Sequence, residues 1–167
     1  LVFGGRFEAA PLGRLAKRVP TALRVAVGAG GLLADGPSVD TLALSADLTL
    51  EKSGVRLFAE ALQDTRTPDA QPVLAGTLAG EVERRSIVAE LSGYVLCDCV
   101  ELALRYERYD NNRAVDDFGD QQLITGGINY YFKGHGLKVQ ANYIYRDETG
   151  PIEIDNNALV IGVSGAM

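Results

Sequence analysis

Hydrophobic and polar residues alternate at every second position in segment after segment of this chain. In the segment 137–146 one face is apolar, and the other is polar with Ile144 as the exception; the apolar positions are Leu137, Val139, Ala141, Tyr143 and Tyr145. A period of two is the pattern of a β-strand with two unlike faces. No segment shows a sustained helical period, so the sequence predicts an all-β fold.

The strand pattern recurs about nine times along the chain. The predicted strands are 1–9, 22–28, 41–51, 55–63, 87–95, 100–109, 122–132, 137–146 and 159–163. Their succession, without any intervening helix, predicts an antiparallel up-and-down meander.

Short and long connections alternate between the predicted strands. Short turns are expected at 52–54, 97–99 and 133–136, and longer links at 32–38, 64–84, 110–117 and 147–154. Short turns on one rim and long loops on the other are typical of transmembrane β-barrels, in which the short turns are periplasmic. A soluble, lipocalin-like barrel has a similar rhythm, and alternation alone does not tell which face points inward.

Two features favour lipid on the outside. The polar faces carry unlike charges that a wide, water-filled lumen keeps hydrated, although the solvent around a soluble barrel would do the same; they are Arg6, Glu8, Arg24, Asp47, Arg56, Glu60, Glu90, Glu101, Arg105, Glu107, Lys138 and Arg146. Aromatic residues crowd the strand ends, which suits interfacial girdles but also ordinary strands; they are Tyr106, Tyr109, Tyr130, Tyr131, Phe132, Tyr143 and Tyr145.

The length and net charge of the chain exclude several classes of protein. The 167 residues carry a formal net charge of −6, which argues against a nucleic-acid-binding protein. No uncharged stretch reaches the roughly 20 residues that a membrane helix requires. The chain starts at Leu1 without an initiating Met, and a strand count taken from the C-terminus requires at least one further upstream strand. We therefore expect residues 1–167 to be a single β-barrel domain, the C-terminal half of a transmembrane barrel of about 16–18 strands.

The C-terminal two thirds of the chain resembles the phosphate-selective porin O and P family of outer-membrane channels. The resemblance lies in residues 54–61, 101–110 and 126–143, and more weakly in Gly5-Arg6-Phe7 followed by Pro11. Its most specific stretch is a strand ending in Asn-Tyr-Tyr-Phe, then a Gly-His turn and Leu-Lys-Val-Gln. The resemblance implies a porin-type barrel, trimers and small ionic solutes such as phosphate. Phosphate-passing members use a cationic lumen, whereas here acidic and basic residues are about equally frequent on the polar faces.

The candidate site is the set of polar and charged residues expected to line the pore. Charges in a pore wall set ion preference, and the same residues could simply pair across strands. The candidates are Arg56, Glu60, Glu101, Arg105, Glu107, Lys138, Gln140, Asn142 and Arg146.

Other candidate sites are weaker. Asp110, Asn111, Asn112, Asp116, Asp117 and Asp120 form an acidic loop that could hold Ca²⁺ or bridge to lipopolysaccharide, but it lacks the EF-hand pattern, and a solvated loop is favoured. Cys97 and Cys99 are expected to be free or weakly reactive thiols, because a disulfide at that spacing is strained. His135 has no triad partners, and Gly28–Gly31 is expected to form a bend or turn. We expect no catalytic residue, metal or cofactor.

The resulting hypothesis is a bacterial outer-membrane channel for passive diffusion of small hydrophilic or ionic solutes. The alternative is a non-conducting barrel that acts as an anchor or subunit of a larger envelope complex. Expected partners are outer-membrane lipid, lipopolysaccharide, small ionic solutes and further copies of the chain, and not nucleic acid. An outer-membrane enzyme and a soluble binding barrel are minor alternatives.

Overall fold

The structure is a computed structural model that describes residues 1–12, 22–68, 80–96, 99–115, 119–132, 137–148 and 156–165. Within them nine strands form one antiparallel sheet in chain order. The strands are β1 Val2–Ala9, β2 Arg24–Asp35, β3 Val39–Lys52, β4 Val55–Pro68, β5 Val82–Leu96, β6 Val100–Asp110, β7 Gln121–Phe132, β8 Leu137–Glu148 and β9 Ala158–Gly165. The prediction of an all-β, up-and-down meander is confirmed.

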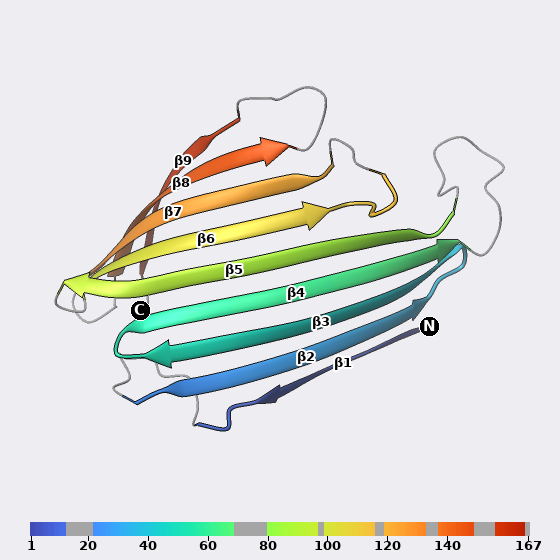
Figure 1. Ribbon diagram of the computed structural model, residues 1–167, viewed down its shortest axis with the longest axis horizontal. Helices are drawn as coiled ribbons and strands as arrows, with labels where there is room; N and C mark the ends of the chain where they lie inside the picture. The colour runs from blue at the N-terminus through green and yellow to red at the C-terminus, as the bar shows by residue number, and fades with distance from the viewer. Residues whose placement is uncertain are drawn as a thin grey trace.

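The sheet is curved and open, with β1 and β9 at its two edges (Figure 1). Neighbouring strands are antiparallel throughout, so β1 and β9, the first and last of nine, run in the same direction. Direct pairing of β1 with β9 would therefore be parallel. An all-antiparallel closed barrel needs an odd number of further strands between these two edges.

The distribution of polar and apolar side chains is the reverse of that in a water-soluble protein. Among the described residues Ala26 is the sole buried apolar residue, while Thr49, Asp64, Ser92 and Asp120 are buried. Along β3, Leu42, Leu44 and Leu48 are exposed, Leu44 by 55%, and the polar residues Ser45 and Asp47 between them are half-buried. A curved sheet crowds the side chains on its concave face, so we place the polar face on the concave side and the apolar face on the convex side.

The sheet has two rims that differ in their connections. We call the rim at the C-terminal ends of β3, β5 and β7 the short-turn rim, and the rim at the C-terminal ends of β4, β6 and β8 the long-link rim. At the former, Ser53 and Gly54 have φ of 50° and 81°, as a two-residue type I′ hairpin turn requires. The asymmetry has two exceptions, because the 14 residues 10–23 separate β1 from β2 at the short-turn rim and only residues 36–38 separate β2 from β3 at the long-link rim.

Several predicted boundaries are wrong because the strands are longer than the alternation indicated. The expected link 32–38 is a three-residue turn, since β2 and β3 stay paired as far as Asp35 and Asp40. Gly28–Gly31 is not a bend but the middle of β2, fully paired on both sides. The expected link 64–84 is likewise shorter, because β4 and β5 remain paired from Asp64 with Arg84 out to Arg66 with Val82.

The expected free thiol at Cys99 is wrong as well. Cys99 is disulfide-bonded, and Cys97, the one other cysteine of the sequence, lies outside the described residues. The backbone N–H of Cys99 donates to the Leu96 carbonyl at 2.9 Å. Disulfides are common in the periplasm, the compartment expected for the short-turn rim.

Four aromatic residues of the apolar face lie at two levels, whereas Tyr143, also expected in the girdles, pairs with Gly126 between them. Tyr130 and Phe132 stack edge-to-face at 4.5 Å near the short-turn rim, and Tyr106 and Tyr145 flank Ile124 nearer the long-link rim. Ile124 and Phe132 are eight positions apart, about 27 Å along the strand. A tilt of about 40° reduces this to about 21 Å, near the roughly 25 Å height of a barrel's apolar band. Tyr109 and Tyr131, also expected in the girdles, face the polar side instead.

Candidate functional site

All nine candidate residues lie on the polar face of the sheet. Cross-strand partners in an antiparallel sheet point to the same side, and successive residues point to opposite sides. Asp47 pairs with Glu60, Glu90 with Arg105 and Leu123 with Arg146, which joins strands β3 to β8 through one continuous face. The sequence pattern therefore identified one surface, although the candidates come from three separate strands, β4, β6 and β8.

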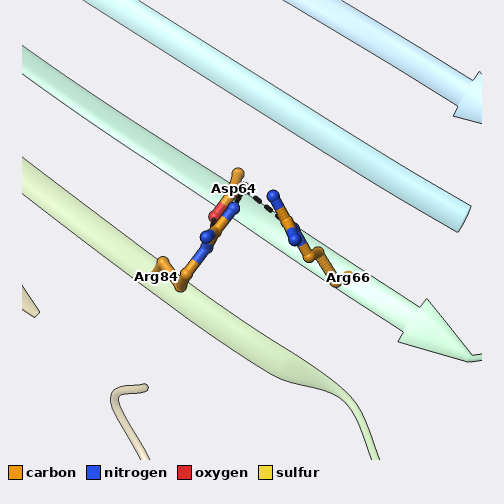
Figure 2. Close-up of polar contacts among 3 residues, drawn as sticks. All are labelled: Asp64, Arg66 and Arg84. Atoms are coloured by element: carbon orange, nitrogen blue, oxygen red, sulfur yellow. Dashed lines mark hydrogen bonds and ion pairs between the residues drawn. The ribbon is translucent and has the colours of Figure 1, made fainter. Parts of the chain in front are cut away.

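One ion cluster lies near the long-link rim, where β4 meets β5. Arg84 Nε donates to Asp64 Oδ1 at 2.6 Å, and Arg84 Nη2 pairs with Asp64 Oδ2, so the pair is bidentate. Arg66 Nε lies 3.4 Å from the same Asp64 Oδ2 (Figure 2). Asp64 is buried by its two partners, and the cluster has two positive charges against one negative charge.

The sequence did not single out Asp64, Arg66 and Arg84. The segment 64–84 was assigned to a loop because Gln63, Thr65 and Thr67, which share the opposite face, are polar and erase the hydrophobic alternation. The sequence nevertheless carries a signal that the strand continues: positions 64 and 66 are charged and have the same parity as the pore-lining candidates at positions 56 and 60.

A second cluster occupies the middle of the face and is predominantly acidic. Arg105 on β6 donates from Nη2 to Glu107 Oε1 at 2.8 Å, and its Nη1 lies 3.7 Å from Glu90 Oε2 on β5. Glu60 lies in the same row as Glu107, one strand beyond Val88. One arginine is thus shared among carboxylates on three strands. This part of the wall has an excess of negative charge.

The third group, near the short-turn rim, mixes charged and neutral polar residues. Glu101 Oε2 accepts hydrogen bonds from Tyr131 Oη at 2.6 Å and from Asn129 Nδ2 at 3.0 Å. Arg56 lies over the Phe58 ring, 5.8 Å from its centroid, and 3.8 Å from Glu51. Residues that face the polar side at this rim are therefore held in place by neighbours on adjacent strands.

The four candidates on β8 spread along the whole strand. Lys138 lies opposite Tyr131 and Ser164, and Gln140 opposite Asn129 and Gly162. Asn142 extends over Gly127, where a methyl group would come within 2.5 Å of Asn142 Oδ1. The backbone N–H of Arg146 donates to Asn157 Oδ1 at 3.1 Å. These residues share the face but do not form one cluster.

From Arg6 on β1 to Arg146 on β8, the charges on the polar face balance among the residues whose side chains the structure describes. The eight bases are Arg6, Arg24, Arg56, Arg66, Arg84, Arg105, Lys138 and Arg146, and the eight acids are Glu8, Asp47, Glu51, Glu60, Asp64, Glu90, Glu101 and Glu107. They are not evenly mixed, since the rim cluster at Asp64 is net positive and the central cluster at Arg105 net negative. Such a wall offers successive zones of opposite sign to a passing ion.

The acidic loop shows local structural bonds rather than a metal-ligand set. Asp120 Oδ1 accepts the Asn111 backbone N–H at 3.1 Å, and Asn112 Oδ1 accepts that of Ala114 at 3.2 Å. Asp116, Asp117 and the turn with His135 lie outside the described residues. Within the described part of the chain no group of three or more His, Cys, Asp or Glu side chains is placed to hold a metal ion.

A curved antiparallel sheet that exposes leucine on its convex face and gathers ion pairs on its concave face has the wall architecture of a transmembrane β-barrel. In the described residues no helix is long and apolar enough to cross a membrane. Residues 99–161 match the family model of phosphate-selective porin O and P, from the turn before β6 into β9. At the level of that family, the match indicates a porin-type outer-membrane channel.

The match confirms the resemblance found in residues 101–110 and 126–143. The other stretches that carried it, 54–61 and Gly5-Arg6-Phe7, lie outside the matched residues. No curated protein and no solved structure matches the chain.

Proposed function

We propose that this chain forms part of the wall of an outer-membrane channel through which small hydrophilic or ionic solutes, including anions such as phosphate, diffuse down their gradients. The observation that carries the proposal is the reversed distribution of side chains, with leucines exposed on the convex face and Asp64 and Thr49 buried on the concave face. A lipid environment stabilises the former, and a water-filled lumen keeps the latter hydrated.

Residues 1–167 would supply a single unit, the C-terminal half of a barrel of about 16–18 strands, which is wide enough for an aqueous lumen. The common direction of β1 and β9 supports this part of the proposal, because further strands are needed to join them in antiparallel order. The nine candidate residues would then line about half of the pore wall. The bacterial outer membrane would be its location, with further copies of the chain as partners.

The balance of charge on the polar face supports weak rather than strict ion selectivity. A strictly anion-selective pore would concentrate bases along the path of the ion, as electrostatic focusing requires. Here the central cluster around Arg105 contains more acids than bases. We therefore expect phosphate to be one permeant ion among several.

Single-channel recording of the complete protein in planar bilayers tests the channel. Stable conductance steps and a small reversal potential in a salt gradient are expected. Absence of conductance from protein that is folded, as judged by heat-modifiable electrophoretic migration, would contradict the proposal. It would favour a non-conducting barrel that anchors or joins an envelope complex.

A further inference from the structure

Three arginines gather where the apolar face meets the long-link rim. Arg85 on β5, Arg108 on β6 and Arg113 in the link after β6 line a cavity of about 180 Å³ together with Ile87 and Asp110. Arg108 pairs with Ile87 and Gln122, so its side chain belongs to the apolar face and not to the pore wall. Charge at this position has no role in lining the lumen.

The cavity lies just beyond the aromatic level of the apolar face. Arg108 is two residues farther along β6 than Tyr106, about 7 Å toward the long-link rim. Tyrosines at such levels sit at the boundary between acyl chains and headgroups. Arginines one level farther out face the headgroups themselves.

The local bonds leave hydrogen-bonding capacity for a ligand. Arg113 Nη1 donates to Glu83 Oε1 at 2.5 Å, and its backbone N–H donates to the Glu83 carbonyl at 2.9 Å, which fixes the link against β5. Arg85 donates one bond, 3.3 Å long, to Gln63. Within the described part of the chain no hydrogen bond or ion pair occupies Arg108, and the buried Asp110 Oδ1 has no donor.

Three guanidinium groups against two carboxylates, Asp110 in the cavity wall and Glu83 paired with Arg113, leave a net positive site for a compact anionic group. Guanidinium binds phosphate through paired N–H donors, and basic pockets at membrane surfaces bind lipid headgroups. The hydrogen bond to Glu83 also raises the pKa of Arg113, so this guanidinium stays charged. The Asp110 carboxylate accepts a hydrogen bond from a hydroxyl of the sugar that carries the phosphate.

We propose that the cavity lined by Arg85, Arg108 and Arg113 binds the phosphate of a phosphorylated glycolipid in the outer leaflet. The proposal rests on the proposed function in one respect, namely that the long-link rim faces outward. Its position on the apolar face favours a lipid headgroup over free phosphate, which would reach the polar face through water.

The test measures retention of lipid A, the phosphorylated anchor of lipopolysaccharide, by the complete protein in detergent micelles, read by native mass spectrometry. Wild-type protein should bind bisphosphorylated lipid A, and Arg108→Gln should bind it about tenfold more weakly, the effect of losing one charge-assisted contact. Arg108→Lys should retain most of the binding because it keeps the charge.

Lys52→Gln is the matched control, since Lys52 lies on the same face at the opposite, short-turn rim. It should bind lipid A like wild type. Equal binding of dephosphorylated lipid A, an unaffected Arg108→Gln variant, or loss in Lys52→Gln alone would overturn the proposal, as would displacement of the lipid by equimolar inorganic phosphate. Conductance is recorded on the same preparations, so failure of the channel and failure of the lipid site remain distinguishable.

Discussion

Arg6 on β1 forms an ion pair with Asp47 on β3, at 2.7 Å between Nη2 and Oδ2, and the bond crosses over the intervening strand β2. The residue beneath it is Gly28, which pairs with Glu8 on one side and Asp47 on the other. A methyl group on Gly28 would overlap both the guanidinium and the carboxylate. Glycine at this position therefore permits a contact between two strands that are not neighbours.

Gly28→Val is expected to destabilise the barrel by about 1–3 kcal/mol, because the new side chain displaces the ion pair from a crowded face. Thermal unfolding in detergent would measure the change. Gly126→Val is the control, since Gly126 has the opposite orientation and nothing lies within 4 Å of its added carbon. Equal melting temperatures for the two variants would show that the ion pair between Arg6 and Asp47 does not depend on the room that glycine leaves at position 28.

Leu104 and Ala103 are consecutive residues on opposite faces of β6, Leu104 being 54% exposed. Leu104→Arg should destabilise insertion by about 2–4 kcal/mol, because it places a charge on the lipid-facing side near mid-membrane. Ala103→Arg should insert normally, since water and the carboxylates of Glu90 and Glu101 are available on the polar face. Folding yield into lipid vesicles measures both, and a reversed order would mean that the assignment of inside and outside is wrong.

The alternation of apolar and polar residues predicted the fold and most of the polar face, because each strand of a barrel has one face toward lipid and the other toward water. Residues 100–109 and 137–146 have strong contrast between faces, and their strands were placed within two residues of the observed ends. Alternation alone is symmetric and does not tell which face points inward; the charges on the polar faces and the aromatic residues at the strand ends were needed to favour a polar lumen. The curvature of the assembled sheet decides it, and curvature arises from pairing across strands.

The residues that were missed lie where the strands extend beyond the apolar band. At Asp64–Arg84 and at Arg108 both faces are polar, so the period of two disappears although pairing continues. Gly28 was read as a turn because glycine is rare within strands, whereas here a neighbouring ion pair needs the space. Such features depend on contacts between strands and have no signature within one strand.

Asp64→Asn leaves Arg84 and Arg66 near each other without their shared carboxylate. We expect a loss of about 2–4 kcal/mol in stability, because breaking a largely buried ion pair leaves uncompensated charge. Glu8→Gln should cost about 0–1 kcal/mol, because Glu8 and its 3.9 Å partner Arg6 are both about half exposed or more. Chemical unfolding monitored by heat-modifiable migration compares the two variants, and similar losses would contradict the special role of Asp64.

Arg105 should control the sign of the charge in the middle of the pore wall. Arg105→Gln leaves Glu90 and Glu107 without their shared base, so the reversal potential in a salt gradient should move toward cation preference. Glu107→Gln should shift the reversal potential toward anion preference, because one carboxylate fewer then neutralises Arg105. Lys52→Gln removes a positive charge from the apolar face at the short-turn rim and should leave the reversal potential unchanged.

If Arg105→Gln and Lys52→Gln shift the reversal potential equally, the net charge of the protein, and not the pore wall, sets the ion preference. Opposite shifts from Arg105→Gln and Glu107→Gln, with no change in Lys52→Gln, would place the ion path along the face that bears these two residues.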